Sequence, residues 1–157
     1  FPASIADLPP FEDYSMKNRT YRFIGKKPLY PFGYGLSYTR FVYSGLKTAV
    51  LKEGVRLAFR LRNAGSFDGD EVVQVYLRWK KIKNTPVPNC ELVFFRRLSL
   101  KKGEARDVRL RISREQLLLT DENGKRFFQP DAEFELFIGG DSSLNAPLST
   151  QIILHTK

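Results

Sequence analysis

The sequence contains a single cysteine, Cys90, and a single histidine, His155. One cysteine excludes an internal disulfide and a metal site built from cysteines, and we interpret Cys90 as a small neutral side chain rather than a nucleophile. One histidine excludes any site that needs two imidazoles, and His155 lies too near the chain end to be held as a general base. No run of about 18 apolar residues is present, so no membrane-spanning segment is expected.

The motifs of common active sites are also absent. We find no nucleophile elbow, no phosphate-binding glycine loop and no zinc signature containing histidine. Paired carboxylates can hydrolyse glycosides, and the candidates are Glu12 with Asp13, Asp68 with Asp70 and Glu71, and Asp121 with Glu122. Acids in such turns cap backbone groups more often than they catalyse, and Asp68 and Asp70 offer too few oxygens for a calcium loop. We therefore predict no catalytic residue, no metal and no cofactor in this chain.

Positive charge is in excess, with a net charge of +9 and a pI near 9.8. Most arginines in residues 55–62 and 106–112 occupy alternate positions, which is typical of the solvated face of a half-buried strand. A residual basic cluster comprises Arg78, Lys80, Lys81 and Lys83. It could meet an acidic surface, but no aromatic and basic motif of an RNA-binding module accompanies it, so we expect no nucleic acid partner.

The most informative segment is Pro31–Tyr38, in which a proline and two glycines alternate with aromatic residues. Pro31 fixes one φ angle, and Gly33 and Gly35 allow conformations or close approaches that a Cβ would prevent. This pattern predicts a fixed loop at a junction between packed bodies.

The chain divides near residue 38. Residues 1–38 hold five of the nine prolines and are predicted to form an extended docking arm, with one short strand through Thr20–Phe23. The start, at Phe1, has neither an initiator methionine nor a signal peptide, so we expect an excised piece of a longer protein.

Residues 39–157 alternate short strands with turns. Strands are predicted over residues 40–46, 55–62, 71–79, 91–100, 105–112, 117–119, 126–128, 133–138 and 150–155, with at most one helical turn after Ser113. Asn123 and Gly124 suit a tight hairpin. These features predict an all-β fold, an immunoglobulin-like antiparallel β-sandwich of about seven strands with an extended N-terminal arm. Both faces of residues 71–79 are partly apolar, which favours a central strand, and Trp79 is expected to pack in the core or an interface rather than on a sugar.

Several motifs resemble the carboxyl-terminal part of glycoside hydrolase family 3 enzymes. They are residues 13–23, residues 28–39, Asn63-Ala64-Gly65, residues 69–76, residues 92–98 leading to Gly103-Glu104, and residues 137–143. The last four are similar to landmarks of that family's fibronectin type III-like domain. Asn18 and Phe94 stand where the family commonly has glycine.

The resemblance implies a β-glucosidase or β-xylosidase whose catalytic acids lie outside this chain. We then expect a non-catalytic scaffold domain in carbohydrate metabolism whose partner is the catalytic domains of the same polypeptide, in a periplasmic or extracellular enzyme. The predicted inter-domain docking residues are Arg19, Tyr21, Phe32, Tyr34 and Tyr38. Two alternatives stay open: a carbohydrate-binding module that uses Trp79 or exposed tyrosines in weak sugar contacts, and a basic adhesion module that binds polyanions.

Overall fold

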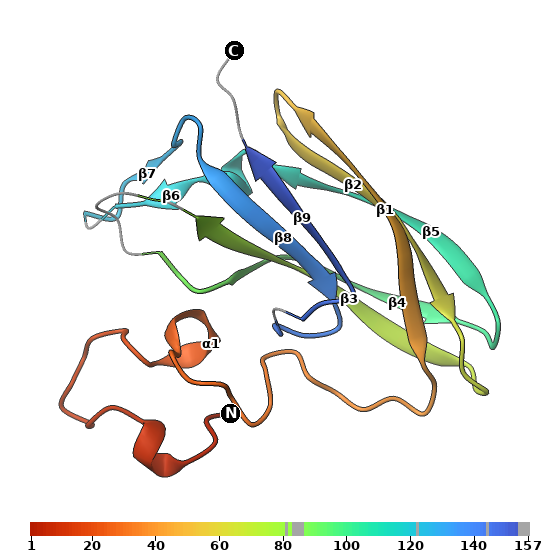
Figure 1. Cartoon of the computed structure of the whole chain (residues 1–157), viewed down its shortest axis with the longest axis horizontal. Coiled ribbons are helices and arrows are strands. Elements are labelled where there is room, and N and C mark those ends of the chain that lie inside the picture. The colour runs from red at the N-terminus through yellow and green to blue at the C-terminus, as the bar shows by residue number, and fades with distance from the viewer. Residues whose placement is uncertain (81, 83–86, 122, 144, 154–157) are drawn as a thin grey trace.

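A computed structural model describes residues 1–80, 82, 87–121, 123–143 and 145–153. Two antiparallel sheets pack face to face, a three-stranded sheet in the order β1-β2-β5 and a four-stranded sheet in the order β4-β3-β8-β9 (Figure 1). A two-stranded ribbon, β6-β7, accompanies them. The strands are β1 (Phe41–Leu51), β2 (Gly54–Asn63), β3 (Gly69–Lys80), β4 (Glu91–Leu100), β5 (Ala105–Ser113), β6 (Leu119–Thr120), β7 (Arg126–Phe127), β8 (Glu133–Gly139) and β9 (Leu148–Ile153).

The core lies between the two sheets and follows from alternation. In β2, Val55, Leu57 and Leu61 are 0% exposed, and β3 places its own alternate residues opposite them. Trp79 is buried at the end of this row and makes an edge contact with Phe134, the ring centroids being 5.3 Å apart. The immunoglobulin-type sandwich and the core position of Trp79 are therefore confirmed.

Most predicted strands agree with the structure to within two residues at each end. β1 is longer than expected because it runs on to Leu51, through a bulge between Ser44 and Lys47. The single turn after Ser113 is present as a 3-10 helix, Glu115–Leu117. The hairpin is formed by β6 and β7, with Gly124 at a φ of +78°. Of the last predicted strand, only the part that ends at Ile153 is described.

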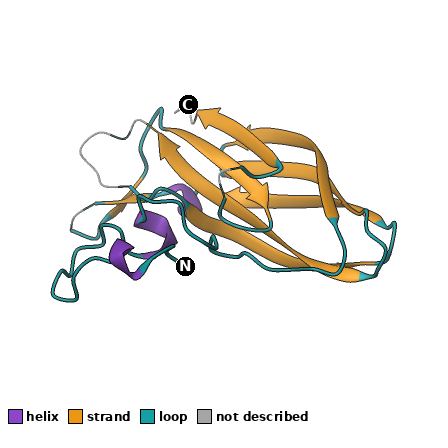
Figure 2. Cartoon of the chain, turned by 60° about the horizontal axis from the view of Figure 1, so that its bottom comes forward, coloured by secondary structure: helices purple, strands orange, loops and turns teal. Residues whose placement is uncertain are grey.

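The strand predicted at Thr20–Phe23 is wrong. These residues form one helical turn, α1 (Thr20–Phe23), and a 3-10 turn, η1 (Ile5–Asp7), precedes it (Figure 2). Four residues carry little intrinsic preference, and tertiary contacts of Tyr21 decide the conformation. Asn18, at a φ of +59°, makes the preceding bend and accepts a hydrogen bond from the Gly25 amide through Oδ1.

The arm meets the sandwich at Asn63, which is fully buried. The Thr39 hydroxyl donates to Asn63 Oδ1 at 2.5 Å, and Asn63 Nδ2 donates to the carbonyls of Phe67 and Leu100 at 2.8 and 3.1 Å. A Cβ on Gly65 would overlap Thr39, so only glycine fits there. The Asn63-Ala64-Gly65 motif thus forms a hydrogen-bonded turn that fixes the position of Thr39, just before β1 begins.

Candidate docking site between the arm and the sandwich

We call residues 1–38 the arm. Its central contact with the sandwich is aromatic, because the ring of Tyr21 meets the ring of Tyr76 edge-on with centroids 6.2 Å apart. Within the arm, the ring of Phe32 stacks on Tyr21 with centroids 4.4 Å apart. Tyr76 comes from the outer face of β3 and is only 1% exposed. The Leu92 amide of β4 donates to the Tyr21 hydroxyl at 3.2 Å. Two predicted docking residues therefore bind the arm to its own sandwich.

The Gly33 turn fits against a buried amide. Gly33 has a φ of +82°, and a Cβ there would overlap the side-chain carboxamide of Gln74. Gln74, which is 5% exposed, donates through Nε2 to the carbonyls of Gly33 and Gly140. Both features require glycine at position 33.

The backbone next to Gly33 is also tied to the sandwich. The Phe32 carbonyl accepts from the Ser142 amide at 2.8 Å and lies 3.3 Å from the Tyr76 hydroxyl. Burial raises the pKa of Tyr76, so this hydroxyl remains a neutral hydrogen-bonding group.

A second set of bonds holds α1 to the segment before β4. Asn89 donates from its backbone amide to the Arg22 carbonyl at 2.6 Å and from Nδ2 to the Ile24 carbonyl at 2.7 Å. Arg22 forms an ion pair with Glu91 at 2.8 Å. Cys90 is buried beside Tyr76, and burial raises the pKa of its thiol, which suits a packing role rather than a nucleophile.

The other predicted docking residues lie elsewhere. Arg19 organises the arm itself, since its guanidinium donates to the carbonyls of Pro10, Asp13 and Ser15. Tyr34 lies beside Tyr30, the ring centroids being 5.2 Å apart, and remains half exposed. Tyr38 is 97% exposed and contacts no ring in the described part of the chain. The five residues thus do not form one cluster.

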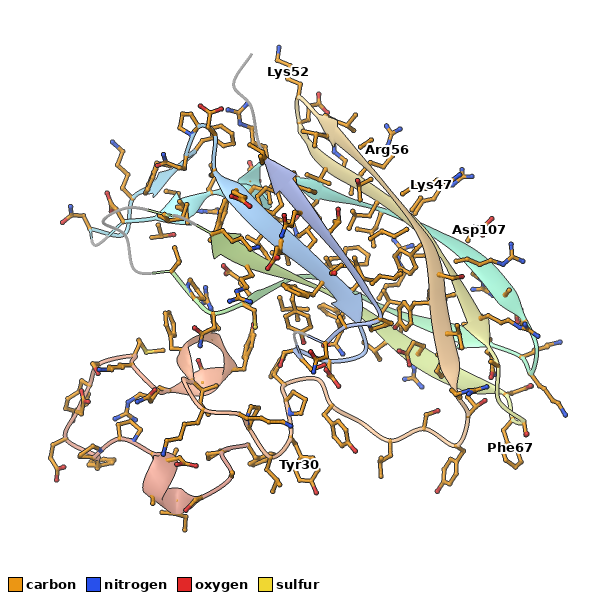
Figure 3. All side chains as sticks on the ribbon, viewed as in Figure 1. Tyr30, Lys47, Lys52, Arg56, Phe67 and Asp107 are labelled. Carbon is orange, nitrogen blue, oxygen red and sulfur yellow. The ribbon has the colours of Figure 1, made fainter. Side chains whose placement is uncertain are left out.

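Exposed apolar surface is concentrated on the arm. Twelve large hydrophobic side chains of the arm are exposed, against six in the described part of the sandwich. The twelve are Phe1, Ile5, Leu8, Phe11, Tyr14, Met16, Leu29, Tyr30, Phe32, Tyr34, Leu36 and Tyr38. In Figure 1 the arm lies on the side of the four-stranded sheet, and Tyr30 points away from the strands in Figure 3. Large exposed apolar side chains are thus twice as numerous on the arm as in the described part of the sandwich.

Three of the carboxylate candidates have structural roles. Asp70 pairs with Arg97, Asp68 accepts from the Lys102 amide at 2.7 Å, and Asp121 accepts from the amides of Asn123 and Lys125 within the hairpin turn. Glu122, Lys81, Lys83 and His155 lie outside the described residues. Within the part of the chain that the structure describes, no group of three His, Cys, Asp or Glu could hold a metal ion, and no helix is long and apolar enough to cross a bilayer.

Glu71 is set apart from the other acids by its environment. The Tyr43 hydroxyl of β1 donates to Glu71 Oε1 at 2.6 Å across the sandwich, and burial raises the pKa of the Glu71 carboxyl. Burial, followed by the Glu71 hydrogen bond, raises the pKa of Tyr43 as well. This pair links the two sheets, and the nearby charge of Asp141 adds to the effect of burial on the pKa of the Glu71 carboxyl.

Gln74, Tyr76 and Asn89 were not among the predicted site residues. A signal for two of them exists, because Gln74 and Tyr76 alternate with Val73 and Val75 on a central strand. An amide and an aromatic ring on the outer face of such a strand indicate that something covers that face. No sequence pattern indicates Asn89, because it bonds to backbone carbonyl groups of residues distant in the sequence.

The folded chain is a two-sheet sandwich of the immunoglobulin class, and its arm packs against the outer face of the four-stranded sheet. Residues 71–142 match the family described as fibronectin type III-like domain. A putative β-xylosidase of Formosa agariphila is 35% identical over 90% of this chain, and a xylan 1,4-β-xylosidase of Xylanibacter ruminicola is 34% identical over 86%. A periplasmic β-glucosidase of Salmonella typhimurium is 31% identical over 91% of the chain.

Solved structures agree with these matches. The β-glucosidase 3B of Thermotoga neapolitana, in complex with glucose, superposes with a TM-score of 0.76 at 34% identity over 87% of this chain and 19% of that one. The chain spans only 19%, 16% and 20% of the lengths of the Formosa, Xylanibacter and Salmonella relatives, respectively. It belongs to the carboxyl-terminal fibronectin type III-like domains of the glycoside hydrolase family 3 β-glucosidases and β-xylosidases.

Proposed function

We propose that this chain is a non-catalytic scaffold domain of a β-glycosidase, with the arm as the connector that docks the sandwich on the catalytic domains. The observation that carries the proposal is the division of the arm into two surfaces. One surface, around Tyr21 and Phe32, is used by the chain's own sandwich, while Leu36 and Tyr38 are 91% and 97% exposed. An apolar surface left over after internal packing fits a neighbouring body of the same polypeptide.

Hydrolysis of a β-glucoside or β-xyloside would use two carboxylates held by the domains that the relatives have in addition to this one. The sandwich would then contribute position and stability. A periplasmic or extracellular location for the whole enzyme is part of the same proposal, and one relative is named a periplasmic β-glucosidase.

The first test is turnover. The purified chain is expected to release no aryl group from an aryl β-glucoside or an aryl β-xyloside. Release that exceeds the uncatalysed background, and that remains with repeated purification, would refute a non-catalytic role.

The second test addresses docking. Binding of the chain to the separately produced catalytic part of its parent enzyme is measured by calorimetry, with a Leu36→Ser/Tyr38→Ser variant. Both side chains are almost fully exposed, so the variant is expected to fold normally and to bind at least about tenfold more weakly, since burial contributes about 25 cal/mol per Å². Phe67→Ser, at a 63% exposed site on the β2–β3 connection, is the matched control. Equal binding by all three proteins would contradict the docking role of the arm.

A further inference from the structure

The outer face of the three-stranded sheet carries positive charge in rows. The register aligns Ser44 with Arg60 and Asp107, Lys47 with Ala58 and Arg109, and Ala49 with Arg56 and Arg111. We define the arginine face as the exposed cations on these rows and on the row of Val42: Lys47, Arg56, Arg60, Arg62, Arg109 and Arg111. In Figure 3, Lys47, Arg56 and Asp107 point away from the sandwich on this side.

The charge of the arginine face is largely uncompensated. Arg60 lies 3.6 Å from Asp107, and Arg111 pairs with Glu53 at the β1–β2 turn. The other four cations form no ion pair with any described residue: Lys47, Arg56, Arg62 and Arg109. Moreover Arg56 and Arg111 stand directly opposite each other on paired strands, an arrangement that disfavours folding.

Solvation alone does not explain a face on whose rows six cations accompany a single acid, Asp107. The arm covers Gln74 and Tyr76 on the outer face of the four-stranded sheet. The cations that stay accessible on that face are paired: Arg78 and Lys80 approach Glu135, and Arg97 contacts Asp70. The same chain therefore balances charge on one outer face and leaves it unbalanced on the other. The two outer faces lie on opposite sides of the sandwich, so the arginine face is also remote from the arm (Figure 1).

The geometry of the arginine face suits a flat, repeating anion. Side chains on one face recur about every 6.8 Å along a strand and about every 4.8 Å between strands. Five of the six cations are arginines, whose planar fork binds carboxylate with two parallel hydrogen bonds. The rows contain no aromatic residue on which a base or a neutral sugar could stack, and Val42 is their only large apolar side chain, too little to enter a bilayer.

We propose that the arginine face binds a polysaccharide that carries uronic acid carboxylates. Recognition is by charge-assisted hydrogen bonds to the carboxylates, so neutral polymers of the same length are not bound. The choice of a polysaccharide among polyanions rests on the proposed function, because a β-glycosidase acts on carbohydrate. The sandwich would hold the enzyme close to an acidic glycan while the catalytic domains act on neighbouring chains.

The test is calorimetric titration of the chain with polygalacturonate at low salt, alongside neutral xylan, duplex DNA and anionic lipid vesicles. The variant Arg56→Gln/Arg109→Gln is expected to bind polygalacturonate at least about tenfold more weakly. The matched control, Lys17→Gln/Lys125→Gln, removes the same charge from exposed positions on the arm and the β6–β7 turn. It is expected to lose less than about threefold.

Folding is checked in parallel. Arg56→Gln removes one of two like charges that stand opposite each other in the strand register, so its melting temperature is expected to equal or exceed that of the parent chain. Equal losses in the two double variants would reduce the effect to net charge and overturn the proposal, as would tighter binding of duplex DNA or vesicles than of polygalacturonate. Docking of the arm to the catalytic part is measured with other residues, so failure here leaves the proposed function intact.

Discussion

Replacement of Gly33 by alanine tests the contact between arm and sandwich most directly. Two independent penalties meet at this position. Gly33 has a φ of +82°, a conformation that disfavours any residue with a Cβ, and the added methyl group would overlap the buried carboxamide of Gln74. To make room, Gln74 would have to give up its bonds to the carbonyls of Gly33 and Gly140.

The magnitude can be worked from these two effects. A positive φ costs a residue with a Cβ about 1 to 2 kcal/mol. Loss of a hydrogen bond by a buried amide adds about 1 to 3 kcal/mol. Gly33→Ala is therefore expected to weaken the contact of the arm with the sandwich by about 2 to 5 kcal/mol, which corresponds to at least about 30-fold in the opening equilibrium.

Amide hydrogen exchange, followed by NMR, reports this opening residue by residue. The amides of Ser142 and Asn89 donate to arm carbonyls, so they are expected to exchange at least about 30-fold faster in Gly33→Ala. Amides at Val75 and Ile138, which pair within the four-stranded sheet, are expected to keep their protection.

Two other glycines separate the contributions. A Cβ on Gly35 would meet nothing within 4 Å at an ordinary φ, so Gly35→Ala is expected to be silent. Gly103 has a φ of +77° and open space around it, so any loss of stability in Gly103→Ala comes from the positive φ angle alone and not from steric overlap. If Gly33→Ala exchanges like Gly35→Ala at Ser142 and Asn89, the arm does not dock through the Gln74 contact and the reasoning fails.

Three further predictions concern the sandwich. Asn63→Ala orphans the carbonyls of Phe67 and Leu100 and is expected to lower the free energy of unfolding in urea by about 3 kcal/mol; a change below about 1 kcal/mol would contradict the role of Asn63. Burial raises the pKa of Glu71 in the folded protein, so the stability it gives is present below the unfolded pKa and is lost as pH rises through the folded pKa. Glu71→Gln is therefore expected to lose less stability than the parent chain as pH rises above about 4.3, the ordinary pKa of a glutamate, and an unchanged pH profile would argue against this effect. Trp79 is 7% exposed, so added glycans are expected to leave its fluorescence unchanged, whereas saturable quenching would favour a carbohydrate-binding module.

Much of the fold could be predicted because strand periodicity is a direct consequence of half-burial. Val55, Leu57 and Leu61 alternate with arginines, and the structure buries the first set and exposes the second. The extension of β1 to Leu51 was missed because the bulge at Ser44 and Lys47 breaks the alternation. The helical turn at Thr20–Phe23 was missed because its conformation is set by contacts of Tyr21 with residues far away in the sequence.

The docking site could be predicted only in part. Glycine and aromatic residues at 31–38 indicate a fixed loop, and the structure places Phe32 and Gly33 against the sandwich as that pattern requires. The sequence does not say which body each ring contacts. Tyr34 and Tyr38 have the same residue type as Tyr21, yet the structure leaves them exposed, because partner choice depends on the direction in which the backbone leaves the loop.

The contact of the arm with its own sandwich has a consequence for inter-domain placement. A flexible linker with apolar side chains would lose conformational freedom on docking, at about 1 to 2 kcal/mol for each ordered residue. Here Tyr21, Phe32 and Gly33 are already fixed by the four-stranded sheet, so the exposed rings that follow are presented from a rigid base. Loosening that base with Gly33→Ala should therefore weaken docking to the catalytic part even though Gly33 itself contacts only the sandwich. Measured by the same calorimetry as Leu36→Ser/Tyr38→Ser, an unchanged affinity in Gly33→Ala would mean that the exposed rings act without support from the sandwich.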